Sequence, residues 1–270
     1  MTQSSPILLF DSGVGGLTVY DALRELLPDA PVIFAADYAG LPYGKKTEAQ
    51  VSARVAGLLG RMTERFRPRL VCIACNTAST IALGNVRDVL EVPVVGTVPA
   101  IKPAAESTQS GVIGLLGTAG TIRQAYVDDL ERKFASGKTL LRHAAPDLVD
   151  EAEKKLRGET VDRAVLKAAL EGLEAGEKGL WIDRVILGCT HFPLLADELH
   201  DVATMELGWS PDTRFLDGAA GIARRIVHLL DGQSFAAEGP NRFITTGPLD
   251  QTKALEAALA SRGFGPPEAF

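Results

Sequence analysis

Short apolar runs recur along this chain, and longer segments with helical periodicity separate them. The runs are ILLF (7–10), VIFAA (32–36), LVCIA (70–74), VPVVG (92–96), VIGLL (112–116) and RVILG (184–188). Runs of four or five apolar residues fit buried parallel strands, whereas residues 17–27 and 47–66 fit amphipathic helices. Alternating strands and helices of this kind predict an α/β fold with mainly parallel sheets.

The order of motifs in the first half of the chain recurs in the second half. In the first half the loop DSGVGG (11–16) follows a strand, and a later strand ends at Cys75. In the second half the loop GTAGT (117–121) follows a strand, and a later strand ends at Cys189. This echo predicts two pseudo-symmetric α/β domains.

The expected first domain comprises residues 1–98 and 208–270, because the tail from about Thr213 is expected to return to it. The second comprises residues 99–207. Ligands of such sheets bind at the carboxyl ends of the strands, so the active site is expected in the cleft between the two domains.

Composition excludes several classes of protein. The chain has 270 residues, of which 46% are hydrophobic, so it can fill a sizeable core. No apolar run approaches the roughly 20 residues that span a bilayer, and MTQSSP does not resemble a signal peptide, which predicts a cytoplasmic protein without a membrane partner. The net charge of -6 and the lack of Lys and Arg clusters disfavour a nucleic-acid partner.

The three cysteines have different predicted roles. An odd number in a reducing compartment argues against a disulfide framework. Cys72 and Cys75 form a C-x-x-C pair, but neither Cys189 nor a histidine supplies the second half of a zinc site, so no metal is predicted. Cys72 lies within an apolar run and is expected to be a buried core thiol.

Cys75 and Cys189 each end a strand and are expected to open a helix. The unpaired N–H groups of a helix start favour the reactive thiolate. Two such thiols suit the inversion of a carbon centre, in which a base removes a proton from one face while an acid delivers one to the other face. Equivalent positions in two halves favour this functional interpretation over two packed small residues.

The glycine-rich loops do not fit nucleotide motifs. In DSGVGG the third glycine of the dinucleotide fingerprint is replaced by Thr18, and GLPYGKKT (40–47) has the wrong spacing for a phosphate loop. A tight turn explains the glycines. It does not explain Asp11-Ser12, which lie at a strand end suited to holding an amino group and a carboxylate. His191 and Tyr43-Gly44 either serve the site or are ordinary loop residues, and spacing alone does not decide between these interpretations.

Four motifs in this order resemble the glutamate racemase family, within the cofactor-independent aspartate/glutamate racemase superfamily. They are DSGVGG at 11, LPYG at 41, ACNTAS at 74 and GCTHFPLL at 188, and the resemblance covers nearly the whole chain. It implies that Cys75 and Cys189 are the catalytic acid and base, that Asp11 and His191 assist proton transfer, and that no cofactor is needed. The implied substrate-binding residues are Asp11, Ser12, Tyr43, Gly44, Asn76, Thr77, Thr118, Thr121, Thr190 and His191.

The resemblance also bears on substrate and regulation. His191 favours glutamate, since aspartate racemases usually carry a glutamate after Cys-Thr. The run LVDEAE (148–153) departs from the family's V-P-L-V-E segment and leaves open whether Glu153 is the equivalent acid. No extension of the kind that carries an activator site is expected ahead of the first strand, so activation by a peptidoglycan precursor is not predicted.

The expected activity is therefore interconversion of L- and D-glutamate, which supplies D-glutamate for peptidoglycan, in a homodimer as is common in the family. Three alternatives stay open. The substrate is another amino acid such as aspartate, the chain is a non-catalytic amino-acid-binding protein, or it is a pyridoxal-phosphate racemase, for which no clear Schiff-base lysine is found.

Overall fold

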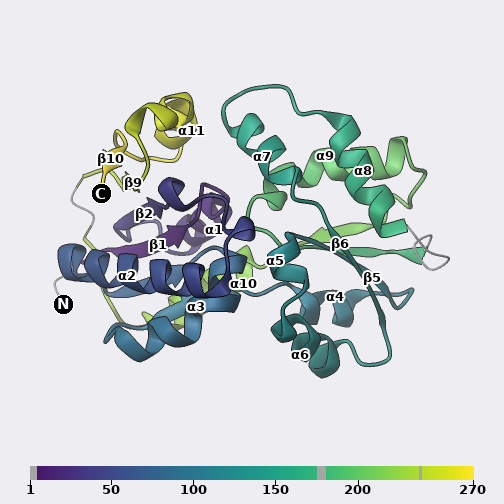
Figure 1. Ribbon diagram of the computed structural model, residues 1–270, viewed down its shortest axis with the longest axis horizontal. Helices are drawn as coiled ribbons and strands as arrows, with labels where there is room; N and C mark the ends of the chain where they lie inside the picture. Colours follow the sequence, from purple (N-terminus) through teal and green to yellow (C-terminus); the bar gives the residue numbers. More distant parts are fainter. Residues whose placement is uncertain (1–4, 175–180, 237–238) are drawn as a thin grey trace. The chain divides into compact units, whose positions relative to one another are not determined.

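The chain folds into two compact α/β units in this computed structural model, which describes residues 5–174, 181–236 and 239–270. The first unit comprises residues 1–97 and 219–270, and the second comprises residues 98–218 (Figure 1). Each unit has its own sheet and its own hydrophobic core.

Parallel strands form the centre of the first unit. They are β1 (Ile7–Asp11), β2 (Val32–Ala36), β3 (Leu70–Ile73), β4 (Val94–Gly96), β9 (Arg242–Thr245) and β10 (Glu268–Ala269). Within the described residues they make one sheet in the order β10-β9-β2-β1-β3-β4, and all its pairs are parallel. All residues of β1, β2 and β3 are buried, as expected for strands covered on both faces.

Helices cover this sheet. They are α1 (Leu17–Leu26), α2 (Glu48–Phe66), α3 (Asn76–Val89), α10 (Ala219–Leu229) and α11 (Glu256–Ala260), with the 3-10 turns η1 (Tyr38–Gly40), η2 (Tyr43–Lys45) and η5 (Leu249–Leu255). A capping box begins α2, because Gln50 N donates to Thr47 Oγ1 (3.2 Å) and Thr47 N donates to Gln50 Oε1 (3.0 Å). Its buried residues, Val51, Val55, Leu59 and Met62, recur every three or four positions and form one apolar stripe.

The second unit repeats this architecture on a smaller scale. Its strands are β5 (Val112–Gly117), β6 (Thr139–Ala144), β7 (Arg184–Leu187) and β8 (Arg214–Leu216). Its helices are α4 (Ile101–Ser107), α5 (Ala119–Ile122), α6 (Ala125–Phe134), α7 (Leu148–Leu156), α8 (Arg163–Glu174) and α9 (Ala196–Met205), with the 3-10 turn η4 (Phe192–Leu195).

The two sheets share one strand order. In the described residues the second sheet runs β6-β5-β7-β8, and the first contains the segment β2-β1-β3-β4. Strand β1 therefore corresponds to β5, and β3 corresponds to β7. The predicted echo between the halves is confirmed in the topology, and the carboxyl ends of β1, β3, β5 and β7 become the places to look for a site.

The boundaries of the units differ from the expected ones. The return to the first unit comes at residue 219 rather than 208, because β8 pairs with β7 in the second sheet, with Arg184 opposite Arg214. The prediction was wrong for residues 208–218, since the short apolar run of β8 does not itself say which sheet it joins. The first crossover, expected after residue 98, follows Thr97.

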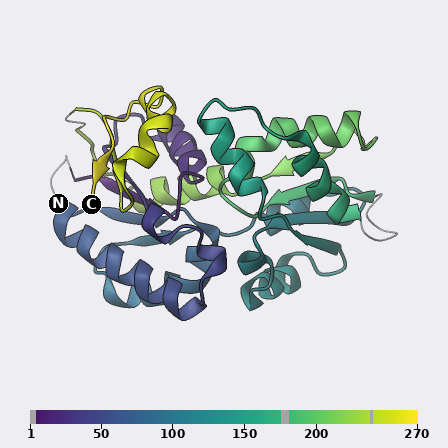
Figure 2. The same cartoon turned by 45° about the horizontal axis from the view of Figure 1, so that its top comes forward.

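The C-terminal segment completes the first sheet. Both views show its yellow strands and helix beside the purple N-terminal strands (Figure 2). Strand β9 pairs with β2, and the rings of Phe34 and Phe243 stack with their centroids 5.6 Å apart. Residues 219–270 thus belong to the first unit.

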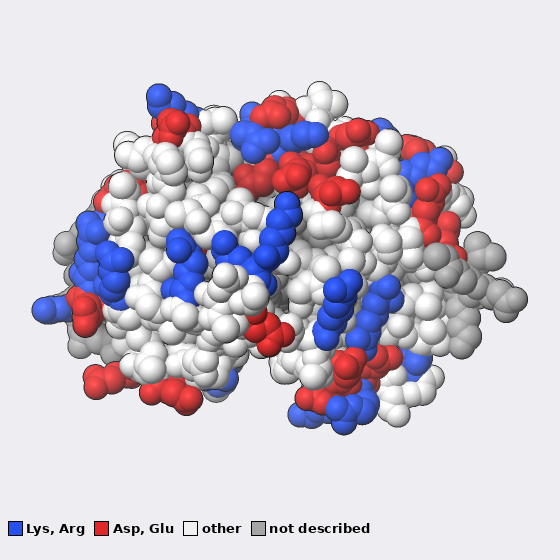
Figure 3. Space-filling model, viewed as in Figure 1, with Lys and Arg blue, Asp and Glu red and all other residues white. Residues whose placement is uncertain are grey.

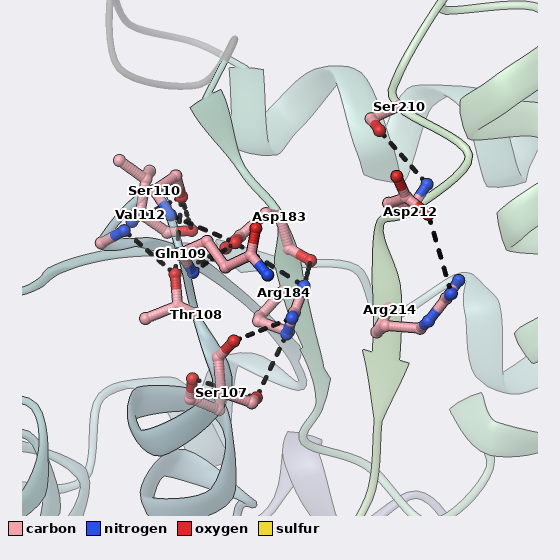
Figure 4. Close-up of polar contacts among 12 residues, drawn as sticks. Ser107, Thr108, Gln109, Ser110, Val112, Asp183, Arg184, Ser210, Asp212 and Arg214 are labelled. Atoms are coloured by element: carbon pink, nitrogen blue, oxygen red, sulfur yellow. Dashed lines mark hydrogen bonds and ion pairs between the residues drawn. The ribbon is translucent and has the colours of Figure 1, made fainter.

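A polar network fixes the amino ends of β5 and β7 in the second unit (Figure 4). The Asp183 carboxylate accepts hydrogen bonds from Thr108 Oγ1 (2.6 Å) and from the amides of Gln109 (2.7 Å) and Ser110 (3.2 Å). Arg184 Nη2 donates to the Ser107 carbonyl oxygen (2.8 Å). These bonds hold the α4–β5 connection against the start of β7. They lie at the amino ends of the strands, whereas Cys189 follows the carboxyl end of β7.

Acidic and basic side chains are interspersed on the face drawn in Figure 3, in keeping with 28 Lys and Arg against 34 Asp and Glu. Within the described residues, no helix is both long enough and apolar enough to cross a membrane. Nor do these residues contain a group of three or more His, Cys, Asp and Glu side chains arranged to hold a metal ion.

Candidate active site

Asp11 is the last residue of β1, and the DSGVGG turn wraps around its carboxylate. The side chain is 0% exposed and accepts hydrogen bonds from Gly13 N (3.0 Å) and Gly16 N (2.6 Å). A Cβ atom at residue 16 would lie 2.7 Å from Ala74 Cβ, so only glycine fits this close approach. The glycines allow a tight turn, and the main-chain amides of this turn hold the buried Asp11 carboxylate in place.

Cys75 follows β3 and is the N-cap residue of α3. Its sulfur accepts a hydrogen bond from Ala78 N (3.5 Å) and lies 3.5 Å from Ser12 Oγ. The Ser12 hydroxyl is also within hydrogen-bond distance of Asp11 Oδ1 (3.2 Å). A carboxylate, a hydroxyl and a thiol therefore form a chain at the ends of β1 and β3.

Asn76 and Thr77 begin α3 beside this thiol, and both are buried. Asn76 Oδ1 has no hydrogen-bond partner within the described residues although it is shielded from water. A buried acceptor without a donor costs free energy, so such a group indicates a place for a ligand's donor. Tyr43 is 2% exposed and packs in the core cluster that contains Cys75, whereas the neighbouring Gly44 is exposed.

The second unit carries a matching chain of groups after β7. Cys189 Sγ lies 3.8 Å from His191 Nδ1, and His191 Nε2 lies 3.2 Å from Glu153 Oε1 of α7. All three side chains are buried. Burial by itself lowers the pKa of the His191 imidazole, but its hydrogen bonds with Cys189 and Glu153 outweigh burial and raise that pKa well above the ordinary value.

The local structure around Cys189 differs from the prediction. Cys75 does open an α-helix, but Cys189 is followed by a turn and by η4, and α9 begins only at Ala196. Pro193 accounts for the difference, since an α-helix that began at Cys189 would need the N–H of residue 193 to donate to the Cys189 carbonyl oxygen, and proline has no N–H. The positive end of an α-helix therefore acts on Cys75 and not on Cys189, whose thiol has an imidazole beside it instead.

The threonines predicted to bind substrate lie near the other strand ends of the second unit. Thr118 follows β5 as the N-cap residue of α5, and its hydroxyl lies 3.1 Å from that of Thr121. Thr190 lies between Cys189 and His191 and is buried. The second unit thus gathers Thr118, Thr121, Glu153, Cys189, Thr190 and His191, and the first gathers Asp11, Ser12, Tyr43, Gly44, Cys75, Asn76 and Thr77.

The structure adds two observations that the sequence did not give. Glu153, whose role stayed open, is the partner of His191. Asp37 was missed altogether, although it directly follows the buried strand VIFAA just as Asp11 follows ILLF. Cys72 is fully buried within β3, which confirms the expected core thiol, and burial raises its pKa.

Comparison with known proteins identifies the family. Residues 14–226 match the model of the family described as Asp/Glu/Hydantoin racemase. The chain belongs to this racemase family. A glutamate racemase of Sphingopyxis alaskensis is 56% identical over 262 residues, which cover 97% of this chain and 96% of that protein.

Solved structures agree with this membership of the racemase family. The glutamate racemase of Escherichia coli, crystallised with L-glutamate and the activator UDP-MurNAc-Ala, superposes with a TM-score of 0.89 at 40% identity and 98% coverage of both chains. The isoform RacE1 of Bacillus anthracis superposes with a TM-score of 0.82 at 27% identity, covering 100% of this chain and 98% of that one. The α/β fold with mainly parallel sheets is thereby confirmed.

Proposed function

We propose that this protein interconverts L- and D-glutamate by proton transfer at the α-carbon, using two cysteines and no cofactor. The proposal rests on two matching series of side chains in hydrogen-bond contact, Asp11–Ser12–Cys75 and Glu153–His191–Cys189. Their cysteines follow equivalent strands of the two related units. The glutamate racemases among its relatives support glutamate as the substrate.

In the proposed reaction the two thiols act from opposite faces of the bound amino acid. One cysteine, as the thiolate, removes the α-proton, and the other, as the thiol, delivers a proton to the opposite face of the resulting carbanion. The two cysteines exchange roles when the other enantiomer is bound. A protonated His191 can donate from Nδ1 to the Cys189 sulfur while Glu153 accepts from Nε2, and Asp11 acts on Cys75 through Ser12.

The substrate's charged groups need partners on both units. Asn76 Oδ1, the buried acceptor without a partner, suits the ammonium group, together with the nearby carboxylate of Asp11. The hydroxyls of Thr77, Thr118, Thr121 and Thr190 are proposed to turn their single O–H toward the carboxylates, since a hydroxyl can rotate and still accept hydrogen bonds from its present neighbours. The main-chain amides of Tyr43 and Gly44 are proposed to do the same.

The product fits a role in supplying D-glutamate for bacterial peptidoglycan in the cytoplasm. We propose this role, and a homodimeric enzyme, from the resemblance of the sequence to the glutamate racemase family. Binding one small zwitterion with two carboxylates needs no metal or prosthetic group in this scheme, since both proton transfers use side chains.

The two-thiol mechanism is tested with L-glutamate in D2O, followed by circular dichroism and by loss of the α-proton signal. We expect Cys75→Ala and Cys189→Ala each to lower kcat by about 10³-fold or more, because each removes one acid/base group. Cys72→Ala is the matched control, since Cys72 is also a buried thiol but lies inside β3 rather than after its carboxyl end; it is expected to lower stability and keep turnover.

Retained turnover in either active-site variant would contradict the mechanism. If the wild-type protein binds glutamate without exchanging its α-proton, the chain is a binding protein rather than a racemase. Faster turnover of aspartate in a substrate panel would overturn the choice of glutamate, and a visible aldimine absorbance would reveal a pyridoxal-phosphate enzyme.

A further inference from the structure

Asp37 is a buried carboxylate that takes no part in the proton transfer proposed above. It directly follows β2, its side chain is 0% exposed, and its amide donates to the Asp11 carbonyl oxygen (2.8 Å). Strands β1 and β2 are neighbours, so Asp37 lies one strand away from the cluster around Cys75.

Four side-chain hydrogen bonds converge on the Asp37 carboxylate. Oδ2 accepts from Tyr43 Oη (2.6 Å) and from Arg54 Nε (2.5 Å). Oδ1 accepts from Arg54 Nη2 (2.6 Å) and from Thr246 Oγ1 (2.5 Å). The donors lie in η2, in α2 and just after β9, so one carboxylate ties three segments to the end of β2.

We propose that Asp37 is a positioning residue, which acts through Tyr43 to hold the main chain of Tyr43-Gly44 where glutamate binds. This role rests on the function proposed above. It gives a role in substrate binding to the buried Asp37 carboxylate, which contacts neither catalytic cysteine in the hydrogen bonds described above.

Energetics favour a geometric role for this ion pair over a stabilising one. Asp37 is fully buried whereas the Arg54 side chain is 32% exposed, so the attraction between them largely offsets the hydration that the carboxylate loses and adds little net stability. A two-pronged Arg–carboxylate contact does fix positions closely. Gly40 shows how tightly the chain follows the carboxylate, since a Cβ atom there would lie 2.2 Å from Asp37 Oδ2 and 2.5 Å from Arg54 Nε.

The Tyr43 hydroxyl donates its single proton to Asp37, so it cannot also donate to a substrate carboxylate. Burial, and after it the charge of Asp37, raise the pKa of the Tyr43 phenol, which therefore stays protonated and donates. The amides of Tyr43 and Gly44 donate to no acceptor within the described residues. Asp37 thus holds the ring against the core around Cys75 and leaves the main chain to meet the substrate.

Steady-state kinetics in both directions test the proposal with Asp37→Asn and with the double variant Asp37→Leu/Arg54→Met. We expect Asp37→Asn to raise KM for L- and D-glutamate by about tenfold, because a tenfold change corresponds to the loss of one charge-assisted hydrogen bond. We expect kcat to stay within about threefold of wild type. The double variant removes the buried carboxylate together with its half-buried partner, so we expect its Tm to recover relative to Asp37→Leu, which leaves Arg54 unpaired, while KM stays high.

Tyr20→Phe is the matched control for a merely structural loss. Tyr20 is a buried tyrosine of the same unit, whose hydroxyl donates to the Arg262 carbonyl oxygen (2.6 Å) and accepts from Asn241 Nδ2 (2.8 Å). Its removal is expected to lower Tm and leave KM unchanged. Hydrogen exchange gives a readout without turnover, with exchange in residues 38–47 rising about tenfold in the double variant while α2 stays protected.

A wild-type KM in Asp37→Asn overturns the proposal, and so does recovery of both Tm and KM in the double variant. Wild-type turnover in the same assay tests the proposed function separately. If wild type binds glutamate without turning it over, the calorimetric Kd replaces KM and the same comparison of variants decides about Asp37.

Discussion

The groups that connect carboxylate and thiol differ between the two units. Ser12 lies between Asp11 and Cys75, whereas His191 lies between Glu153 and Cys189. A serine hydroxyl does not titrate near neutral pH, but an imidazole does. The two related units therefore present chemically unequal acid/base groups, although their topology is the same.

This inequality predicts different pH profiles of kcat for the two directions, because in the proposed mechanism the two directions use Cys189 in opposite protonation states. Glu153 helps to raise the pKa of His191. Glu153→Gln lowers that pKa, so the limb of the profile that reports His191 should move to lower pH. Stopped assays of both enantiomers across pH 5.5 to 9.5 measure the shift.

Glu151→Gln is the control for the Glu153 variant. Glu151 is buried in the same helix and pairs with Lys154 (2.7 Å), not with His191. It is expected to lower stability without moving the limb. An equal shift in both variants, or identical profiles for the two directions, would contradict the assigned role of His191.

At the scale of the element, the Asp183 network fixes where β5 and β7 begin. Burial by itself raises the pKa of Asp183, but hydrogen bonds from Thr108 and from the amides of Gln109 and Ser110 outweigh it and lower the pKa. A lowered pKa contributes stability above the ordinary value of 3.8, and this contribution is lost as the pH falls through the folded-state value.

Asp183→Asn is therefore expected to cost about 1–3 kcal/mol of unfolding free energy at pH 7, because an amide cannot replace all the acceptor positions. The difference from wild type should shrink below about pH 4. Chemical denaturation at pH 7 and pH 3.5 measures it. Asp212→Asn is the control, since that side chain is 93% exposed and should change stability by about 0.5 kcal/mol or less.

The strands that were predicted correctly from the sequence are mostly or fully buried. The fully buried runs of β1, β2, β3 and β5 stood out because both faces of the strand are apolar. Strand β6, TLLRHA, is only half-buried at every position and carries charge, so its pattern gave no signal. Strand β8 has three residues, one of them exposed, which is why its sheet was misassigned.

Sequence motifs predicted those neighbours within the candidate site that lie close together in the chain. Cys75 and Asn76 share one turn, and Cys189 and His191 share another, so spacing alone brings them close. The pairing of Glu153 with His191 and the contact of Asp37 with Thr246 join segments far apart in the chain. Such contacts depend on how helices and turns pack on the sheets, which periodicity does not specify.

In the proposed two-thiol mechanism one glutamate contacts both clusters, so its binding should protect both clusters from hydrogen exchange at once. If the proposed site is right, saturating D- or L-glutamate slows hydrogen exchange in residues 11–16 and 75–80 of the first unit. It also slows exchange in residues 117–122 and 188–192 of the second. A ligand at about 100 times its Kd stabilises the bound state by about 2.7 kcal/mol, enough to be seen in both segments.

Thr121→Val provides the decisive comparison, because Thr121 belongs to the second unit alone. A ligand shared by both units must lose affinity as a whole when one set of contacts is removed, so protection of residues 75–80 should weaken together with that of residues 117–122. Protection that persists unchanged in the first unit would mean that glutamate binds there independently, and the two thiols would then not act on one molecule. Thr204→Val is the control, at a half-buried threonine of α9 whose hydroxyl donates to the His200 carbonyl oxygen, and it should leave protection of both units as in wild type.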